Sequence, residues 1–193
     1  MEKFNFVIPA AGRGSRLMPF TSQVPKCLVS VLKCPILEHQ LNCINPVYVN
    51  SLTIVLGYKG QKIIKYIKNL NLPYDVFFVD NLDYKISKCG TSLVRSFKNI
   101  SGPIIFLNSD LLFSKRIVDD LVSIKEDNVV IGKSMPENFR LNKYHAKVIG
   151  KEIVDIEYSN TEYDFELIGP VKLSFSAIKQ IKKKLVALRI DVN

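Results

Sequence analysis

An apolar run followed by a loop of small residues lies near the start of the chain and constrains its fold more than any other stretch. Phe4–Ile8 consists largely of big and β-branched side chains, which is typical of a buried strand. The residues after Pro9 are small, namely Ala10, Ala11, Gly12 and Gly14. Small residues let backbone N–H groups approach an anion, and glycine tolerates the positive φ angles that such a loop needs. The sequence therefore predicts a strand that ends in an anion-binding loop.

Cations accompany this loop. Arg13 and Arg16 lie inside it, and Lys26 follows a proline further along the chain. Three fixed cations beside a nest of backbone amides suit a polyphosphate. The glycine pair alone is a weak signal. It is not the dinucleotide-binding fingerprint, because Leu17 stands where the third glycine would be, and it is not a Walker A loop.

Strand and helix patterns alternate after this loop. The expected helices are Ile36 to about Asn45, Gln61–Leu70, Thr91–Lys98, Ser114–Ile124 and Ala177–Leu188, the last capped by Ser174 or Ser176. The expected strands are Leu52–Leu56, Tyr74–Val79, Pro103–Leu107, Val129–Ile131, a hairpin from Lys147 to Ile156, and Glu166–Leu173 broken at Gly169-Pro170. This alternation predicts a mainly parallel sheet with helices on both faces, in one domain over residues 1–193.

Polar residues follow the predicted strands. Ligands of such sheets bind at the carboxyl ends of the strands, so Gly57-Tyr58 and the stretch after Asp80 should share an edge with the small-residue loop. Asp110 comes shortly after the second all-apolar strand. A carboxylate there is suited to hold Mg²⁺ together with substrate phosphates, and its other reading is a turn or helix cap. His39 is predicted to be structural, and His145 is predicted to lie in a polar loop.

Composition excludes several classes of protein. The chain carries 27 Lys and Arg against 18 Asp and Glu, a net charge of +9, but these cations are dispersed and form no basic stripe with aromatics. Nucleic acid is therefore not predicted, and a small anionic substrate accounts for the charge. The four cysteines lack C-x-x-C spacing, and neither a membrane span nor a signal peptide is visible. We expect reduced thiols and a cytoplasmic protein.

The full spacing of the first loop is much more specific than its glycines. It resembles the signature of the sugar-phosphate nucleotidyltransferase family, and it reads Gly12-x-Gly14-x-Arg16-Leu17-x-Pro19-x-Thr21-x-x-x-Pro25-Lys26-x-Leu28. Pro35–His39 is similar to the next segment of that family. The resemblance implies a three-layer, Rossmann-like α/β fold of the nucleotide-diphospho-sugar transferase type with a mixed, mainly parallel sheet. It also implies a Mg²⁺-dependent reaction in which an NTP and a phosphorylated acceptor give an NDP-linked product and pyrophosphate.

Two later segments resemble the choline-phosphate and phosphonate cytidylyltransferase branch. Asn81–Leu93 is similar to its Asn-x-x-Tyr … Ser-Leu segment, and Glu166–Gly169 to its Gly-Glu-Phe-Ile-Gly segment, although Phe165 replaces the first glycine. The resemblance favours CTP as the nucleotide and a small phosphate or phosphonate as the acceptor. Glu157–Asn160 lacks the lysine that sugar-nucleotide branches often direct at a sugar phosphate.

The resemblance also implies roles for single residues. Arg16 and Lys26 would be catalytic, and Asp110 with Glu166 would hold Mg²⁺, with Asp164 as a competitor for the second position. Asn108-Ser109-Asp110 resembles the Asn-Gly-Asp motif of the family, with serine in place of glycine. The predicted nucleotide-binding residues are Ala10, Ala11, Gly12, Arg13, Gly14, Gly57, Tyr58, Gly90, Thr91 and Ser92.

Three other functions stay open at this point. One is a sugar-1-phosphate nucleotidyltransferase, and the second is a catalytically silent subunit of the same fold, against which intact Arg16, Lys26 and Asp110 argue. The third is a glycosyltransferase of similar fold, which should show an Asp-x-Asp motif that the chain lacks. The predicted partners are the NTP and the acceptor, without nucleic acid or a membrane span. A homodimer is left open.

Overall fold

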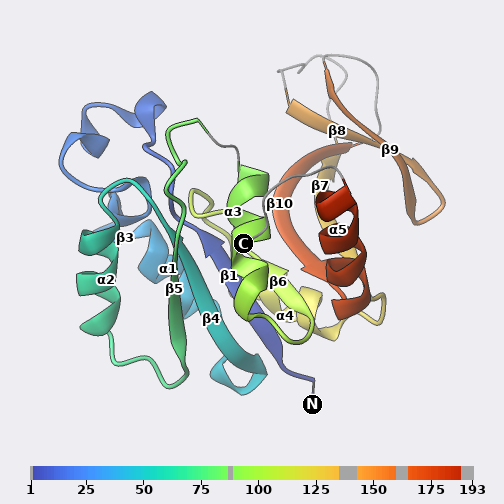
Figure 1. The fold of residues 1–193 in the computed structure, drawn as a ribbon, viewed down its shortest axis with the longest axis horizontal. Helices are drawn as coiled ribbons and strands as arrows, with labels where there is room; N and C mark the ends of the chain where they lie inside the picture. Colours follow the sequence, from blue (N-terminus) through green and yellow to red (C-terminus); the bar gives the residue numbers. More distant parts are fainter. Residues whose placement is uncertain (1, 87–88, 135–142, 160–164, 188–193) are drawn as a thin grey trace.

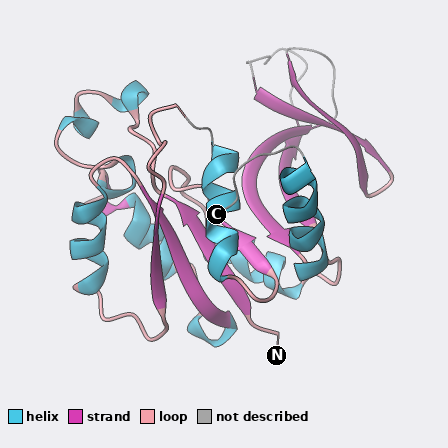
Figure 2. Ribbon diagram, viewed as in Figure 1, coloured by secondary structure: helices cyan, strands magenta, loops and turns pink. Residues whose placement is uncertain are grey.

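One mixed sheet forms the framework of the protein. The computed structural model describes residues 2–86, 89–134, 143–159 and 165–187. Within these residues the sheet has eight strands in the order β5-β4-β1-β6-β10-β8-β9, with β7 also paired to β10 (Figure 1). Figure 2 shows helices on both sides of this sheet.

The first half of the sheet is parallel. β1 (Phe4–Pro9) lies between β4 (Val49–Leu56) and β6 (Ile104–Phe106), and β4 continues to β5 (Val76–Asp80), all in parallel register. Every residue of β1 is buried, as expected for a central parallel strand. The predicted parallel alternation is therefore confirmed, and the carboxyl ends of these strands meet along one edge.

The second half of the sheet is antiparallel and is organised by β10 (Phe165–Leu173). β10 pairs with β6, with β7 (Val129–Ser134) and with β8 (Lys143–Ile149), and β9 (Glu152–Ser159) completes the hairpin with β8.

The expected break of this strand at Gly169-Pro170 is wrong. The strand continues, and the pairing with β7 shifts register between Leu167 and Val171. An irregularity of this kind accommodates the positive φ of 143° at Gly169 and the missing N–H of Pro170 without ending the strand.

Helices cover the two faces of the sheet and give the predicted three-layer α/β fold. α1 (Ile36–Asn42), α2 (Gly60–Lys68) and α4 (Lys115–Ser123) bury their apolar stripes against the face that carries Phe6 and Ile54. On the opposite face lie α3 (Cys89–Ser96) and α5 (Phe175–Ala187), and both are on the viewer's side in Figure 1. The backbone N–H of Ala177 donates to Ser174 Oγ at 3.2 Å, so Ser174 is the cap of α5.

The segment between β1 and α1 is more structured than its sequence indicates. It contains three short 3-10 turns, η1 (Ser15–Leu17), η2 (Phe20–Ser22) and η3 (Lys26–Leu28), and a small ribbon of β2 (Ser30–Val31) with β3 (Cys34–Pro35). None of the helices in the described part of the chain is long and apolar enough to cross a membrane.

Gly57 offers a test of how tightly the first loop is packed on β4. A Cβ at this position would lie 2.5 Å from Ala11 O and 2.7 Å from Tyr84 Cβ. We expect Gly57→Ala to lower the free energy of unfolding by about 2 kcal/mol, because neither neighbour can move without shifting backbone. Urea denaturation measures the change. Gly90→Ala is the matched control, since no atom outside its chain neighbours and the backbone of its own helix lies within 4 Å of its added Cβ. Equal stability of both variants would contradict the packing argument.

Candidate active site

A pocket of about 360 Å³ opens where the parallel strands end. The predicted site residues that line it are Ala10, Ala11, Gly12, Gly14, Arg16, Lys26, Ser92 and Asp110. The rest of the lining consists of Asn81 and Tyr84 from the segment Asn81–Leu93, Asn108 and Ser109 from the motif that ends at Asp110, and Pro9, Ser15, Leu17 and Cys27. The pocket thus lies at the carboxyl edge of the parallel strands, the edge at which the sequence predicts a ligand to bind.

The loop after β1 forms the floor of this pocket. The N–H of Ala10 donates to Val55 O at 2.8 Å, and Ala11 O accepts the N–H of Tyr58 at 2.9 Å, so the loop starts as an extension of the sheet. Gly12 then faces open space, because no atom lies within 4 Å of a Cβ built there. An anion can therefore approach the backbone at this point without a side chain in its way.

Gly14 brings the two ends of the loop together. Its φ of 67° is left-handed, and a Cβ there would lie 3.0 Å from Lys26 Cβ. The hydroxyl of Thr21 donates to Gly14 O at 2.9 Å, and Thr21 is completely buried. Glycine is needed here both for the backbone conformation and for the close approach of Lys26.

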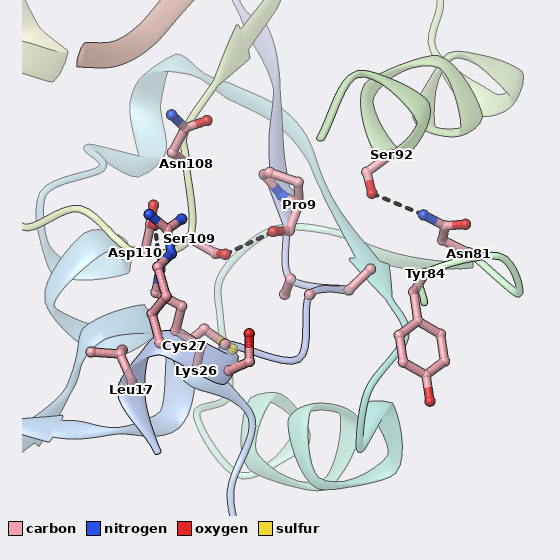
Figure 3. A pocket seen from close by; sticks show the side chains of 16 residues that line it. Pro9, Leu17, Lys26, Cys27, Asn81, Tyr84, Ser92, Asn108, Ser109 and Asp110 are labelled. Carbon is pink, nitrogen blue, oxygen red and sulfur yellow. Dashed lines mark hydrogen bonds and ion pairs between the residues drawn. The ribbon is translucent and has the colours of Figure 1, made fainter. Parts of the chain in front are cut away.

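An ion pair closes one side of the pocket. Lys26 Nζ binds Asp110 Oδ2, and the two side chains are 24% and 40% exposed. Figure 3 shows both residues on the same side of the pocket. The sequence predicted separate roles for this lysine and this carboxylate, and the structure places the two in direct contact with each other. Arg16 lines the same pocket.

The turn that carries Asp110 is held from two directions. Ser109 Oγ donates to Pro9 O at 2.7 Å, which ties the turn to the end of β1. Gln40 Nε2 donates to Asn108 O at 2.7 Å and to Leu111 O at 2.8 Å. Gln40 is 1% exposed and lies within the apolar stripe of α1, beside Leu37 and Leu41. A glutamine inside an apolar stripe is the sequence signal for a buried polar contact, since buried side-chain amides need hydrogen-bond partners.

The opposite side of the pocket comes from the segment that follows β5. Asn81 Nδ2 donates to Ser92 Oγ at 3.2 Å, and these two residues are 2% and 4% exposed. Tyr84 stands beside them, with its Cβ against Gly57 (Figure 3). The structure therefore brings part of the Asn81–Leu93 segment into the pocket, across from Lys26 and Asp110.

Several predicted residues lie outside the pocket lining. Arg13 is placed with its guanidinium 5.8 Å from the centre of the Tyr58 ring, and Gly57 supports the loop from below. Gly90 and Thr91 belong to the first turn of α3.

Glu166 lies on β10, in register with Lys133 and His145. Gly169 of the same strand packs against Asn108 of the pocket. Asp164, the other candidate for a second carboxylate, is outside the described residues.

Neither histidine is placed to act in the pocket. His39 Nε2 hydrogen bonds with Val31 O at 2.8 Å, which agrees with a structural role. His145 is not in a polar loop, as was expected, but is buried in β8. Cys27 does line the pocket, yet burial raises the pKa of its thiol to about 12, so it stays protonated at neutral pH and is no nucleophile.

The side chains present suit a magnesium ion in an open site. Among the described residues no group of three His, Cys, Asp or Glu forms a metal cage. Mg²⁺ does not need one, because it usually keeps several waters and binds one or two carboxylates plus substrate phosphates. Asp110 offers a carboxylate at the pocket wall, and Asn108 and Ser109 place further oxygen atoms beside it.

Replacement of Gln40 tests how the Asp110 turn is held. Gln40→Met keeps the size of the side chain but leaves Asn108 O and Leu111 O without their buried donor. We expect the free energy of unfolding to fall by about 2 kcal/mol or more, as for other buried polar groups left unsatisfied. Urea denaturation should show this loss, whereas Gln61→Met on the exposed side of α2 should change stability by less than about 0.5 kcal/mol. Similar values for both variants would contradict this role of Gln40.

Comparison with known proteins identifies a family and relatives that this sequence resembles. A family model described as nucleotidyl transferase matches residues 6–132, roughly two thirds of the chain. The bifunctional protein GlmU of Methanococcus maripaludis is 33% identical over 147 residues, which cover 74% of this chain and 34% of that protein. The CTP:phosphoglutamine cytidylyltransferase of Campylobacter jejuni is 26% identical over 136 residues, 67% of this chain and 53% of that protein.

Solved structures agree with the fold. The inositol-1-phosphate CTP transferase from T. maritima superposes with a TM-score of 0.78 at 17% identity, over 95% of this chain and 75% of that one. At this identity the likeness concerns the fold alone. The chain spans about a third of the length of its GlmU relatives and about half of the cytidylyltransferase.

Proposed function

The chain belongs to the nucleotidyl transferase family, and from this premise we propose that it joins an NTP, preferentially CTP, to a small phosphate or phosphonate acceptor and releases pyrophosphate. The observation that carries this proposal is the contact between Lys26 and Asp110 at the wall of a pocket with a glycine-loop floor. A cation and a metal-binding carboxylate side by side are what a reaction between two anions requires.

The loop that forms the floor of the pocket and the side chain of Arg16 would bind the triphosphate. The backbone at Gly12 lies where no side chain blocks an anion, and Arg16 adds a fixed positive charge at the same pocket. Arg13, outside the lining, contributes to the local potential rather than to a contact. These groups would hold the phosphates in one orientation, and orientation supplies much of the rate in phosphoryl transfer.

Lys26 would contact both reacting anions. In the proposed step an acceptor oxygen forms a bond to the α-phosphorus, and the bond from that phosphorus to the oxygen that bridges the α- and β-phosphates breaks. The electron pair leaves with pyrophosphate, so the negative charge moves across the α-phosphate. The acceptor is already an anion, so no general base is needed, and the ammonium of Lys26 stabilises the charge that develops on the phosphoryl oxygens.

Magnesium completes this proposal. Asp110 would hold the ion, and when bound the ion would neutralise charge on the phosphate oxygens. Glu166 is the proposed second carboxylate, on the resemblance of Glu166–Gly169 to a metal-holding segment. It does not line the pocket itself, but Gly169 of the same strand lies against Asn108 of the lining. Because Asp110 also binds Lys26, its carboxylate orients the ammonium toward the place where phosphates would lie.

The preference for CTP is supported by the second wall of the pocket. Asn81, Tyr84 and Ser92, which resemble the cytidylyltransferase segment, all line it. A cytidylyltransferase is also among the sequence relatives. The competing proposal is a sugar-1-phosphate nucleotidyltransferase, which the GlmU relatives favour because their identity extends over 74% of the chain.

A screen for pyrophosphate release tests the proposed function. Four NTPs would be combined with phosphocholine, other small phosphates, phosphonates, and glucose and mannose 1-phosphate, each with Mg²⁺. We expect CTP with a small acceptor to react fastest, and an excess of EDTA to stop the reaction. Faster turnover with ATP or GTP, or with a hexose 1-phosphate, would favour the sugar-nucleotide alternative, and no turnover with any pair would contradict enzymatic function.

Lys26→Ala tests the assignment of the transition-state cation. We expect kcat to fall by about a hundredfold or more, with KM for the NTP changed by less than about threefold, because the ammonium acts mainly on charge that develops in the reaction. The fold should persist, since a partly exposed ion pair contributes about 1 kcal/mol or less to stability. Lys68→Ala, an exposed position of α2, is the control for lost charge. An unchanged kcat in the Lys26 variant would exclude the assignment.

A further inference from the structure

The loop that carries the signature motif is fastened by side chains from the start of α2. Tyr58 Oη donates to Thr21 O at 3.1 Å and to Ser22 O at 3.3 Å. Lys59 Nζ also donates to Ser22 O, at 2.5 Å, and Lys62 Nζ donates to Gln23 O at 2.6 Å. Three successive carbonyls of one loop thus bind three side chains of one segment. We call Tyr58, Lys59 and Lys62 the loop clamp.

The tip of the loop has little apolar packing to hold it. Phe20 is 70% exposed and Met18 is 49% exposed, so the tip buries little apolar surface. Carbonyls at the end of a short turn such as η2 lack partners within the turn itself. Ammonium groups are strong donors for such carbonyls, because a charged hydrogen bond is worth more than a neutral one.

The backbone of the loop clamp is adapted to this task. Lys59 has φ 54° and ψ 35°, a left-handed conformation that costs a side chain about 1 kcal/mol or more relative to the right-handed one. This conformation lets its ammonium lie 5.2 Å from the centre of the Tyr58 ring on the way to Ser22 O. The guanidinium of Arg13 also lies over that ring, at 5.8 Å. Tyr58 therefore links the loop to the start of α2.

The fastened carbonyls are directly connected to the pocket. Thr21, whose carbonyl binds Tyr58, donates its own hydroxyl to Gly14 O in the floor of the pocket. Gln23, whose carbonyl binds Lys62, is followed closely by Pro25 and Lys26. The position of the loop thus determines where the floor and the catalytic lysine stand.

We propose that Tyr58, Lys59 and Lys62 are positioning residues, which order the loop before nucleotide binds. Nucleotide binding then does not have to supply the entropic cost of ordering the loop. This inference rests on the proposed function and changes one part of it. Tyr58 was predicted to contact the nucleotide, whereas here it acts through Thr21 and Ser22. Residues that preorganise a binding loop should affect KM for the nucleotide more than kcat.

The test compares two double variants of the whole chain. Lys59→Met/Lys62→Met removes both ammoniums of the loop clamp, and Lys65→Met/Lys68→Met removes the same charge from exposed positions of the same helix, which make no hydrogen bond to the loop in the described structure. Amide hydrogen exchange over residues 18–24 is measured without nucleotide, and KM and kcat are measured with the best NTP and acceptor.

We expect exchange in this loop to become at least about tenfold faster in the clamp variant, since the loss of either one of its two charged hydrogen bonds would give about that factor. KM for the NTP should rise about tenfold with kcat within about threefold. The control variant should change neither quantity, and Lys59→Arg/Lys62→Arg should restore both, because arginine keeps the charge and the donors. Tyr58→Phe, which keeps the ring, should also speed exchange.

Other outcomes would overturn the inference. Unchanged exchange in the clamp variant would show that the lysines do not order the loop. Faster exchange with unchanged KM would show that loop order does not serve nucleotide binding. An equal rise of KM in the control variant would assign the effect to overall charge. If the wild-type protein releases no pyrophosphate, the proposed function fails, while the exchange measurement still decides whether the clamp orders the loop.

Discussion

The ion pair between Lys26 and Asp110 is the contact on which the rest of the site depends. Its two partners come from the loop after β1 and from the turn after β6, so it joins two neighbouring strand ends across the pocket wall. Ion pairs that are as exposed as this one add little stability. The value of this pair is therefore positional, because it holds a cation and a carboxylate beside the open backbone of Gly12, where phosphates would bind.

Buried polar contacts support that pair from the side of the protein interior. Gln40 holds the turn of Asp110 through two carbonyls, and Ser109 ties the same turn to Pro9. On the loop of Lys26, Thr21 performs the corresponding task through Gly14 O. Each of these bonds satisfies a polar group that would be costly to leave alone in the interior, and each therefore also fixes a geometry.

Part of the positive charge of the chain lies around the first loop. A net charge of +9 is spread over the sequence, yet Arg13, Arg16, Lys26, Lys59 and Lys62 gather in or beside one loop. Only some of them face the pocket. Arg16 and Lys26 line it, while Lys59 and Lys62 bind loop carbonyls and Arg13 lies over a tyrosine ring. The cations near the pocket thus divide into two that line it, which the proposed function assigns to the ligand, and three that contact the protein itself.

The sequence by itself determined the alternation of strands and helices, the carboxyl edge that carries the pocket, and most of its first loop, because hydrophobic periodicity and glycine spacing are local properties. Tertiary structure alone decided which side chains meet. Gln40 binds the turn of Asn108 only because the fold packs that turn against α1. Tyr58 and Lys59 hold the loop only because α2 begins beside Ser22. His145 was assigned to a loop, since its strand is recognisable only through pairing with β9 and β10. Contacts between residues far apart in the chain leave no periodic signal in the sequence, so only the tertiary structure reveals them.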